Sequence, residues 1–296
     1  MNRIEVKGEL REQWCKCITD ILKYYIQLCE KYHLRYFIAY GSAIGAARHH
    51  GIIPWDDDID VVMPRPDFEK LLEICKHEDM GKYEIVSPFN TPNYYLPFYK
   101  MCNKETTLLE NEDFKCVMGM YIDIFVYDGM VSDKSISDHL RHKYVKYWNR
   151  FTVASSFYSW ERIMEKLKRG QIKDLVHYFL LSLNRNGYRK KFLKKLYDIT
   201  HAYNYDDMEL IVKYPPGYGA SEVIPKEWIE ESTLLPYEDL QVAIPKDYTR
   251  WLNNYFKDYT QLPPENERHP HHNIAYVNLK KRESLEEVLK KIKKRK

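Results

Sequence analysis

A run of aspartates at the expected start of a β-strand is the part of this sequence best suited to chemistry. Residues 54–61 read Pro-Trp-Asp-Asp-Asp-Ile-Asp-Val. Aspartate is disfavoured in strands and like charges repel, so the run costs stability unless a cation or a polar ligand compensates it. Side chains alternate along a strand, which places Asp56, Asp58 and Asp60 on one face. Because a ligand set made only of oxygens suits Mg2+ or Mn2+, we expect these residues to bind a hard divalent cation.

Two other segments are expected to bring polar groups to these aspartates. Residues 35–40 predict a strand, and residues 41–48 predict a turn into a short helix, where backbone N–H groups favour phosphate. Residues 120–127 predict a later strand in which Asp123 is the one carboxylate among apolar residues. This order of elements resembles the nucleotidyltransferase fold of the DNA polymerase beta type. We therefore expect an α+β fold, with a mixed β-sheet flanked by helices and a helical insertion.

The longer string around the aspartates resembles a known enzyme family. Residues 40–61 are closely similar to the LicD family of phosphotransferases, whose members move phosphocholine from CDP-choline onto sugars. The likeness continues through Lys100, Thr106, Tyr121–Phe125, Tyr255–Pro264, Arg268 and His271–His272, and so covers roughly residues 10–130 and 220–275. The family usually has Tyr-Gly-Asp-Tyr where this chain has Tyr255-Phe256-Lys257-Asp258-Tyr259, so the following loop is expected to differ.

The resemblance implies an activity and a set of site residues. The implied reaction transfers phosphocholine from CDP-choline to a sugar hydroxyl of a cell-surface glycan or its lipid-linked precursor, and releases CMP. Asp58, Asp60 and Asp123 are the implied catalytic residues, and with Asp56 they are the implied ligands of two Mg2+ ions, with Mn2+ as a substitute. The implied donor-binding residues are Gly41, Ser42, Arg48, His49, Lys100, Arg268, His271 and His272. The expected partners are therefore a CDP-linked donor and a glycan or lipid-linked saccharide acceptor, and not nucleic acid.

Several other functions use the same residue types. The chain could transfer another CDP-activated alcohol phosphate, such as ribitol or glycerol phosphate, or a nucleotidyl group from a nucleoside triphosphate. It could also be a non-catalytic scaffold at a membrane surface. A solvated acidic turn remains the simplest alternative for the aspartate run, and a salt-bridged core carboxylate the simplest for Asp123. An EF-hand loop does not fit, because Val61 stands where glycine is required and Asp67 stands at the twelfth position.

Composition favours a folded protein of the reducing cytoplasm. The 296 residues are 44% apolar and 15% aromatic, which is enough for a substantial core. No N-terminal apolar signal segment and no apolar run of membrane-spanning length is apparent, so a cytoplasmic location is expected. The six cysteines show no Cys-x-x-Cys spacing and mostly fall within apolar patterns, which predicts reduced thiols and no structural zinc.

Basic charge is concentrated in two segments although the net charge is only +3. Residues 161–196 contain eleven Lys and Arg against three acids, and residues 280–296 contain nine against three. Both segments carry apolar residues at helical spacing, so both could lie on an anionic membrane surface, on the inner leaflet. The alternative is that both are ordinary amphipathic helices that pack against the protein.

The elements expected from the pattern divide the chain into four parts. A long helix near the N-terminus, a helix over residues 66–77 and short strands near residues 83–86, 96–101 and 106–109 belong to a catalytic core over residues 1–130. Residues 131–213 predict a mainly helical insertion, and residues 214–279 a loop-rich segment that returns to the active site. Residues 280–296 predict a basic amphipathic tail.

Overall fold

One mixed β-sheet forms the centre of the protein. The computed structural model describes residues 4–270, 272 and 274–295. The strands of the sheet are β1 (Phe37–Ile38), β2 (Asp60–Pro64), β3 (Tyr83–Val86), β4 (Tyr99–Leu109), β5 (Met118–Met130), β6 (Leu210–Tyr214), β7 (Val223–Pro225) and β10 (Tyr276–Asn278). The main path is β1-β2-β5-β4-β10, with β3 on β4 and β6 between β5 and β7. β2 and β5 are parallel, whereas every other pairing among the described strands of this sheet is antiparallel. The predicted α+β class with a mixed sheet is confirmed.

Strand β5 connects the parts of the sheet, because different segments of it pair with three different strands. Its first half pairs with β4, its middle also pairs with β2, and its last residues pair with β6. Both of its faces are covered, which explains the almost unbroken burial along its thirteen residues. In this register Asp123 lies opposite Asp60 on one side and opposite Lys100 on the other. Residues in register on adjacent strands point to the same face, so the sheet itself brings these three side chains together.

Helices cover the sheet beside β2 and β5. The long helix α1 (Gly8–Lys31) buries Trp14, Ile18, Ile21 and Tyr25, which recur every three or four residues, and it packs on β4 and β5. Helix α3 (Arg65–His77) packs on β2 and β5. Both helices are confirmed as predicted. The short helix α2 (Tyr40–Ile44) and the π-helical turn η1 (Gly45–His49) follow β1, which is shorter than the strand expected there.

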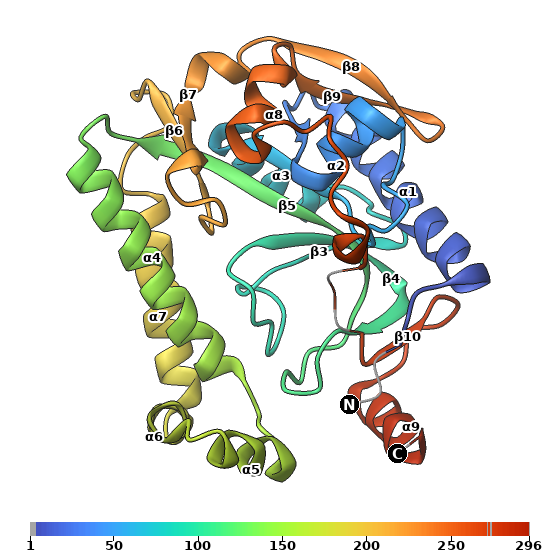
Figure 1. The fold of residues 1–296 in the computed structure, drawn as a ribbon, viewed down its shortest axis with the longest axis vertical. Helices are drawn as coiled ribbons and strands as arrows, with labels where there is room; N and C mark the ends of the chain where they lie inside the picture. Colours follow the sequence, from blue (N-terminus) through green and yellow to red (C-terminus); the bar gives the residue numbers. More distant parts are fainter. Residues whose placement is uncertain (1–3, 271, 273, 296) are drawn as a thin grey trace.

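A helical arm extends from the sheet at the end of β5. It consists of α4 (Lys134–Ser155), α5 (Trp160–Lys168), α6 (Ile172–Ser182) and α7 (Arg185–Thr200). Asp133, Ser159 and Asn184 cap three of these helices by accepting hydrogen bonds from backbone N–H groups in the first turn. Helices α4 and α7 run side by side away from the sheet, with α5 and α6 at their far end (Figure 1). The predicted helical character of this segment is confirmed, and none of the described helices is long and apolar enough to cross a bilayer.

Residues 214–279 contain more regular structure than expected. A hairpin of β8 (Ser232–Tyr237) and β9 (Leu240–Pro245) packs near β1 and η1, and it is followed by helix α8 (Tyr248–Phe256). The short 3-10 turns are η2 (Gly219–Glu222), η3 (Lys226–Ile229) and η4 (Glu265–Glu267). The prediction of a loop-rich segment was therefore wrong for residues 232–256. The hairpin was missed because its two-residue loop is Glu238-Asp239, and Glu238 adopts a φ of 55°, which glycine or asparagine normally occupies.

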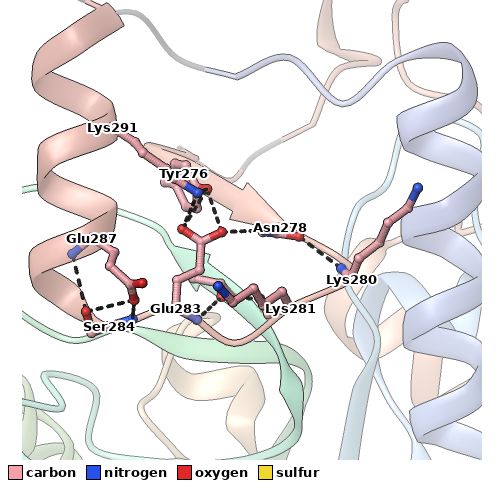
Figure 2. A network of polar contacts seen from close by, with 9 residues as sticks. Tyr276, Asn278, Lys280, Lys281, Glu283, Ser284, Glu287 and Lys291 are labelled. Carbon is pink, nitrogen blue, oxygen red and sulfur yellow. Dashed lines mark hydrogen bonds and ion pairs between the residues drawn. The ribbon is translucent and has the colours of Figure 1, made fainter.

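The basic tail packs against the protein. Helix α9 (Leu285–Arg295) buries Val288 and Ile292 against Leu109 and Tyr276, at the β10 edge of the sheet. The buried carboxylate of Glu283 precedes this helix and accepts hydrogen bonds from the Tyr276 hydroxyl at 3.0 Å and from Lys291 Nζ at 2.7 Å, as well as from the Asn278 amide (Figure 2). The protein covers the apolar side of this tail, as in the alternative of an ordinary amphipathic helix that packs against the protein.

Removal of the Glu283 carboxylate should destabilise this end of the sheet. We expect Glu283→Ala to lower the free energy of unfolding by about 1–3 kcal/mol, because a buried hydroxyl, an amide and an ammonium lose their acceptor. Denaturant unfolding followed by circular dichroism measures the change. The matched control is Lys290→Ala on the exposed side of α9, which loses only a surface ion pair with Glu286 and should stay within about 0.5 kcal/mol of the parent protein. Equal effects of the two substitutions would contradict the role assigned to Glu283.

Candidate active site

Three aspartates from two adjacent strands and the loop before them form the centre of the site. Carboxylate oxygens of Asp58, Asp60 and Asp123 all lie within 4.8 Å of one another. A second set, Asp56, Asp57 and Asp58, meets the same criterion and shares Asp58 with the first. Only Asp60 lies in β2, whereas Asp56 and Asp58 lie in the preceding loop. The predicted residues therefore do come together, although strand alternation is not the reason for Asp56 and Asp58.

Helices α1 and α2 hold the aspartate loop in place. The Arg11 guanidinium donates to the carbonyl oxygens of Asp56 at 2.7 Å and of Ile53 at 3.0 Å. The Trp14 indole donates to the carbonyl oxygen of Asp57 at 2.8 Å. These bonds fix the backbone without using the carboxylates, which stay available for a ligand. The sequence offered no sign that α1 contributes to the site.

The Gly-Ser pair at residues 41–42 has two separate roles in the site. The hydroxyl oxygen of Ser42 accepts a hydrogen bond from the backbone N–H of Asp60 at 3.0 Å, which holds the first residue of β2. A Cβ atom at Gly41 would lie only 2.7 Å from Oδ2 of Asp56. A side chain at position 41 would therefore displace the Asp56 carboxylate from its position in the cluster. Both residues lie next to the aspartates, as the sequence predicted.

The aspartates repel one another strongly in the absence of a cation. Burial and the neighbouring charges of Asp58 and Asp123 raise the pKa of Asp60 well above its usual range. Burial and the charge of Asp58 raise the pKa of Asp56 to about 8. Burial raises the pKa of Asp123 to about 6, although the nearby Lys100 ammonium opposes the rise. Crowded carboxylates with raised pKa values and only oxygen donors fit a hard divalent cation, which would relieve the repulsion.

Lys100 is paired with Asp123, one of the three clustered aspartates. Its side chain is 1% exposed, and Nζ lies 2.5 Å from Oδ1 of Asp123 and 3.9 Å from Oε1 of Glu110. The ammonium also lies 3.2 Å from the centre of the Tyr121 ring, and the Tyr121 hydroxyl donates to Glu110. The structure thus brings Lys100 to the site, as predicted. Its ammonium is buried against Asp123 and is not exposed to solvent, where it could bind a phosphate. Glu110 was missed because nothing in its local sequence separates it from an ordinary surface glutamate.

Asp57 and His272 form a pair that sequence reasoning did not recognise. Nδ1 of His272 lies 2.9 Å from Oδ1 of the buried Asp57, and Nε2 lies 3.7 Å from Oδ2 of Asp58. Burial lowers the pKa of His272, but the hydrogen bond to Asp57 and the charge of Asp58 outweigh it and raise the pKa to about 10. His272 therefore adds a positive charge at the rim of the acidic cluster. His271, also predicted as a donor-binding residue, lies outside the described residues.

Arg48, His49 and Arg268 gather around Trp55 and the loop at residues 259–268. The Arg48 guanidinium donates to the carbonyl oxygens of Tyr259 at 2.7 Å and of Gln261 at 2.8 Å. The Arg268 guanidinium lies 5.4 Å from the centre of the Trp55 ring, and the ring of His49 meets Trp55 edge to face. Burial and the charge of Arg268 lower the pKa of Arg48. In the described contacts these predicted donor-binding residues organise the rim of the site and do not touch the aspartates.

Known proteins are similar both to the segment that carries the aspartates and to most of the length of this chain. A family model described as the LicD/FKTN/FKRP nucleotidyltransferase domain matches residues 33–159. The lipopolysaccharide cholinephosphotransferase LicD of Haemophilus influenzae is 30% identical over 275 residues, which cover 92% of this chain and 99% of the relative. The chain belongs to the LicD family. An uncharacterized protein of Rickettsia prowazekii is 31% identical over 87 residues, 29% of this chain and 30% of its own length.

Membership of the LicD family makes this chain a phosphotransferase enzyme, which removes the scaffold alternative. The segment that matches the family model contains Asp56, Asp58, Asp60, Lys100 and Asp123. His272 and Arg268 lie beyond that segment and reach the site from the C-terminal part of the chain. The six cysteines of this LicD-family chain are free thiols, as predicted, and take no part in the aspartate cluster.

Proposed function

We propose that this chain transfers phosphocholine from CDP-choline to a sugar hydroxyl of a cell-surface glycan or its lipid-linked precursor, and releases CMP. The observation that carries the proposal is the full-length similarity to a lipopolysaccharide cholinephosphotransferase, together with an oxygen-only cluster of Asp58, Asp60 and Asp123. In the proposed reaction the acceptor oxygen forms a bond to the phosphorus that bears choline. The bond from that phosphorus to the bridging oxygen breaks, and CMP departs with that oxygen.

A nucleotidyltransferase core of the DNA polymerase beta type is part of the proposal. Its support is the order of elements: strand β1, the Gly41-Ser42 segment in α2, strand β2 with Asp60, and the parallel strand β5 with Asp123. The parallel pairing places Asp60 directly opposite Asp123, so the two strands present their carboxylates on one face. The description of the family model that matches residues 33–159 names the same domain type.

The aspartates are the proposed ligands of Mg2+, or of Mn2+. Asp58 belongs to both carboxylate sets, and this overlap supports two neighbouring cation sites, with Asp60 and Asp123 in one and Asp56 in the other. When bound, the ions would neutralise the pyrophosphate and lower the pKa of the acceptor hydroxyl. Asp123 is the proposed acceptor of the hydroxyl proton, and Lys100 fixes its position by a 2.5 Å contact with Oδ1. Two side chains hold the backbone of the aspartate segment. The Ser42 hydroxyl accepts from the N–H of Asp60, and the Arg11 guanidinium donates to the carbonyl oxygen of Asp56.

The arginine and histidine side chains at the rim of the site are the proposed donor-binding groups. Among the described residues, Nε of Arg48 and Nε2 of His49 are buried and have no hydrogen-bond partner. Buried donors without partners are costly, so these two nitrogens are available to a ligand. We assign Arg48, His49, Arg268 and His272, with the Gly41 and Ser42 backbone, to the phosphates and the nucleotide of the donor. Their charge would balance the pyrophosphate beside the aspartates.

A comparison of three CDP-linked donors tests the proposed function. The purified protein is incubated with Mg2+, a glycan-lipid extract as acceptor, and either CDP-choline, CDP-ribitol or CDP-glycerol, and released CMP is measured. We expect CMP from CDP-choline, and label from choline in the acceptor fraction. The matched control is the Asp58→Asn variant, which retains the donor-binding cations but loses the residue common to both carboxylate sets.

Two outcomes would contradict the choline assignment. CMP release from CDP-ribitol or CDP-glycerol, and not from CDP-choline, identifies another CDP-activated alcohol phosphate as the donor. Release of pyrophosphate from CTP, with nucleotide incorporated in the acceptor, identifies nucleotidyl transfer instead. Either result would keep the aspartate cluster as the proposed active site. The first would change the donor, and the second would change the group that is transferred.

A further inference from the structure

Helix α6, at the tip of the helical arm, exposes a continuous row of large apolar side chains. These are Ile172, Val176, Phe179, Leu180 and Leu183, the last of which immediately follows the helix. They are between 49% and 83% exposed, whereas Leu175, Tyr178 and Leu181 of the same segment are buried. The helix therefore has an internal face that holds it to the arm and a second apolar face that none of the described residues covers.

The spacing of the exposed residues places them on one side of the helix. Counted from Ile172, they fall at intervals of four, seven, eight and eleven residues. At 3.6 residues per turn these positions form a single stripe. Two further apolar side chains are exposed on the adjoining helix α5, namely Trp160 at 70% and Leu167 at 44%. Single exposed apolar residues are common, but a complete helix face of this kind marks a surface that another body covers.

Basic residues are frequent on the helices that carry this surface and on the helix that follows them. The segment from residue 161 to residue 196 carries eleven Lys and Arg against three acids. Lys168 and Lys173 are exposed on α5 and α6 themselves, and Lys190 and Lys191 are exposed on the first half of α7. An apolar face bordered by cations is the pattern by which helices lie in the headgroup region of an anionic bilayer.

We propose that the exposed face of α6, together with the tip of α5, docks the enzyme on an anionic lipid surface. The apolar stripe would enter the boundary between headgroups and acyl chains, and the surrounding Lys and Arg side chains would contact lipid phosphates. Both helices lie at the end of α4 and α7 that is remote from β6 (Figure 1), and among the described residues neither helix contributes to the aspartate cluster. The inference does not depend on which donor the enzyme uses.

Charge favours a membrane over a second copy of the chain as the occupant. A two-fold symmetric dimer through this face would bring the exposed Lys168 and Lys173 of one copy toward the same residues of the other. Like charges at such an interface oppose association, whereas an anionic bilayer complements them. The basic tail differs in this respect, because Val288 and Ile292 of α9 are buried within the protein. Of the two basic segments, only the one in the arm combines cations with an uncovered apolar face.

Vesicle binding by matched variants tests the proposal. Flotation measures binding of the full chain, without donor or acceptor, to phosphatidylcholine vesicles with and without phosphatidylglycerol. We expect binding only to the anionic vesicles and at low salt, and we expect Leu180→Glu to weaken it by about tenfold or more. Leu234→Glu on β8 is the control, because Leu234 is similarly exposed at 59% but lies far from the arm in the fold (Figure 1). The double variant Lys190→Glu/Lys191→Glu tests the charge contribution without altering the apolar face, and should also reduce binding.

Three results would overturn the proposal. One is absence of binding to anionic vesicles at low salt, and another is equal loss of binding in the Leu180→Glu and Leu234→Glu variants. The third is a concentration-dependent dimer of the parent chain, measured by sedimentation, that Leu180→Glu converts to monomer, because the face would then join two copies. Circular dichroism and thermal melting of each variant confirm that the fold is retained.

Discussion

Replacement of Asp58 or Asp60 by asparagine is expected to reduce transfer by about a thousandfold or more. Each substitution removes one of the three carboxylates whose oxygens lie within 4.8 Å of one another. The free energy of unfolding of the metal-free protein should stay the same or rise, because a crowded negative charge is removed. Initial rates of CMP release and denaturant unfolding measure the two effects.

The contrast with other aspartates makes this result specific. Asp123→Asn should also be inactive, but it should destabilise the fold, because it leaves the buried Lys100 ammonium without its nearest counter-charge. Asp239→Asn, in the exposed turn of the β8–β9 hairpin, should retain activity and stability. Near-normal turnover in both Asp58→Asn and Asp60→Asn would mean that the chemistry takes place elsewhere.

Removal of divalent metal is expected to abolish turnover and to change how stability depends on pH. Activity should be lost in EDTA and restored by Mg2+ or Mn2+, with Zn2+ a poor substitute for a site that has only carboxylate ligands. Metal binding should also raise the melting temperature, because it relieves repulsion among the aspartates. This second readout does not depend on having the correct donor.

The direction of the pH effect follows from the raised pKa values. The pKa of Asp56 is raised from 3.8 to about 8 in the folded protein. Between these two pH values the folded state therefore binds more protons than the unfolded state. The pKa of His272 is raised from 6.5 to about 10 in the folded protein. Its contribution to the stability of the fold is therefore present below pH 6.5 and is lost as pH rises toward 10. Both groups therefore make the metal-free protein less stable as pH rises.

Saturating Mg2+ should counter that decline, because the ion binds the deprotonated carboxylates and binds them more tightly as pH rises. Thermal melting from pH 5 to pH 9, in EDTA and in Mg2+, measures the difference. A metal-free protein whose melting temperature rises steadily across this range would contradict the electrostatic description of the site.

The positions of strands β1 to β5 and the main carboxylates could be predicted because local patterns specify them. Asp123 is recognisable because it lies within an apolar run that forms the buried strand β5. Asp58 and Asp60 are recognisable because carboxylates are unfavourable at the start of a strand. The helices α1 and α3 follow from apolar spacing alone. In these cases the local preference of the sequence agrees with the final structure, so the local pattern alone was enough to predict the element.

The contacts that could not be predicted depend on the path of the chain. His272 meets Asp57 across a sequence separation of 215 residues, and Arg11 meets the loop carbonyls from a helix that shows only a packing pattern. Amphipathic spacing indicated that α6 and α9 each have an apolar face, but not what covers it: β10 and β4 cover that of α9, and the chain leaves one face of α6 exposed. Periodicity identifies a face, whereas tertiary structure decides its partner.

The parallel pairing of β2 with β5 also determines when the site can exist during synthesis. Parallel neighbours need a crossover connection, and here it contains α3, β3 and β4. A chain emerging from the ribosome carries Asp56–Asp60 well before Asp123, and long before His272. The complete ligand set thus forms only after strands distant in sequence have assembled, which makes it a late, high-contact-order feature. An ion bound by these aspartates, as proposed, would therefore bind after the strands have assembled and would not act as a folding nucleus.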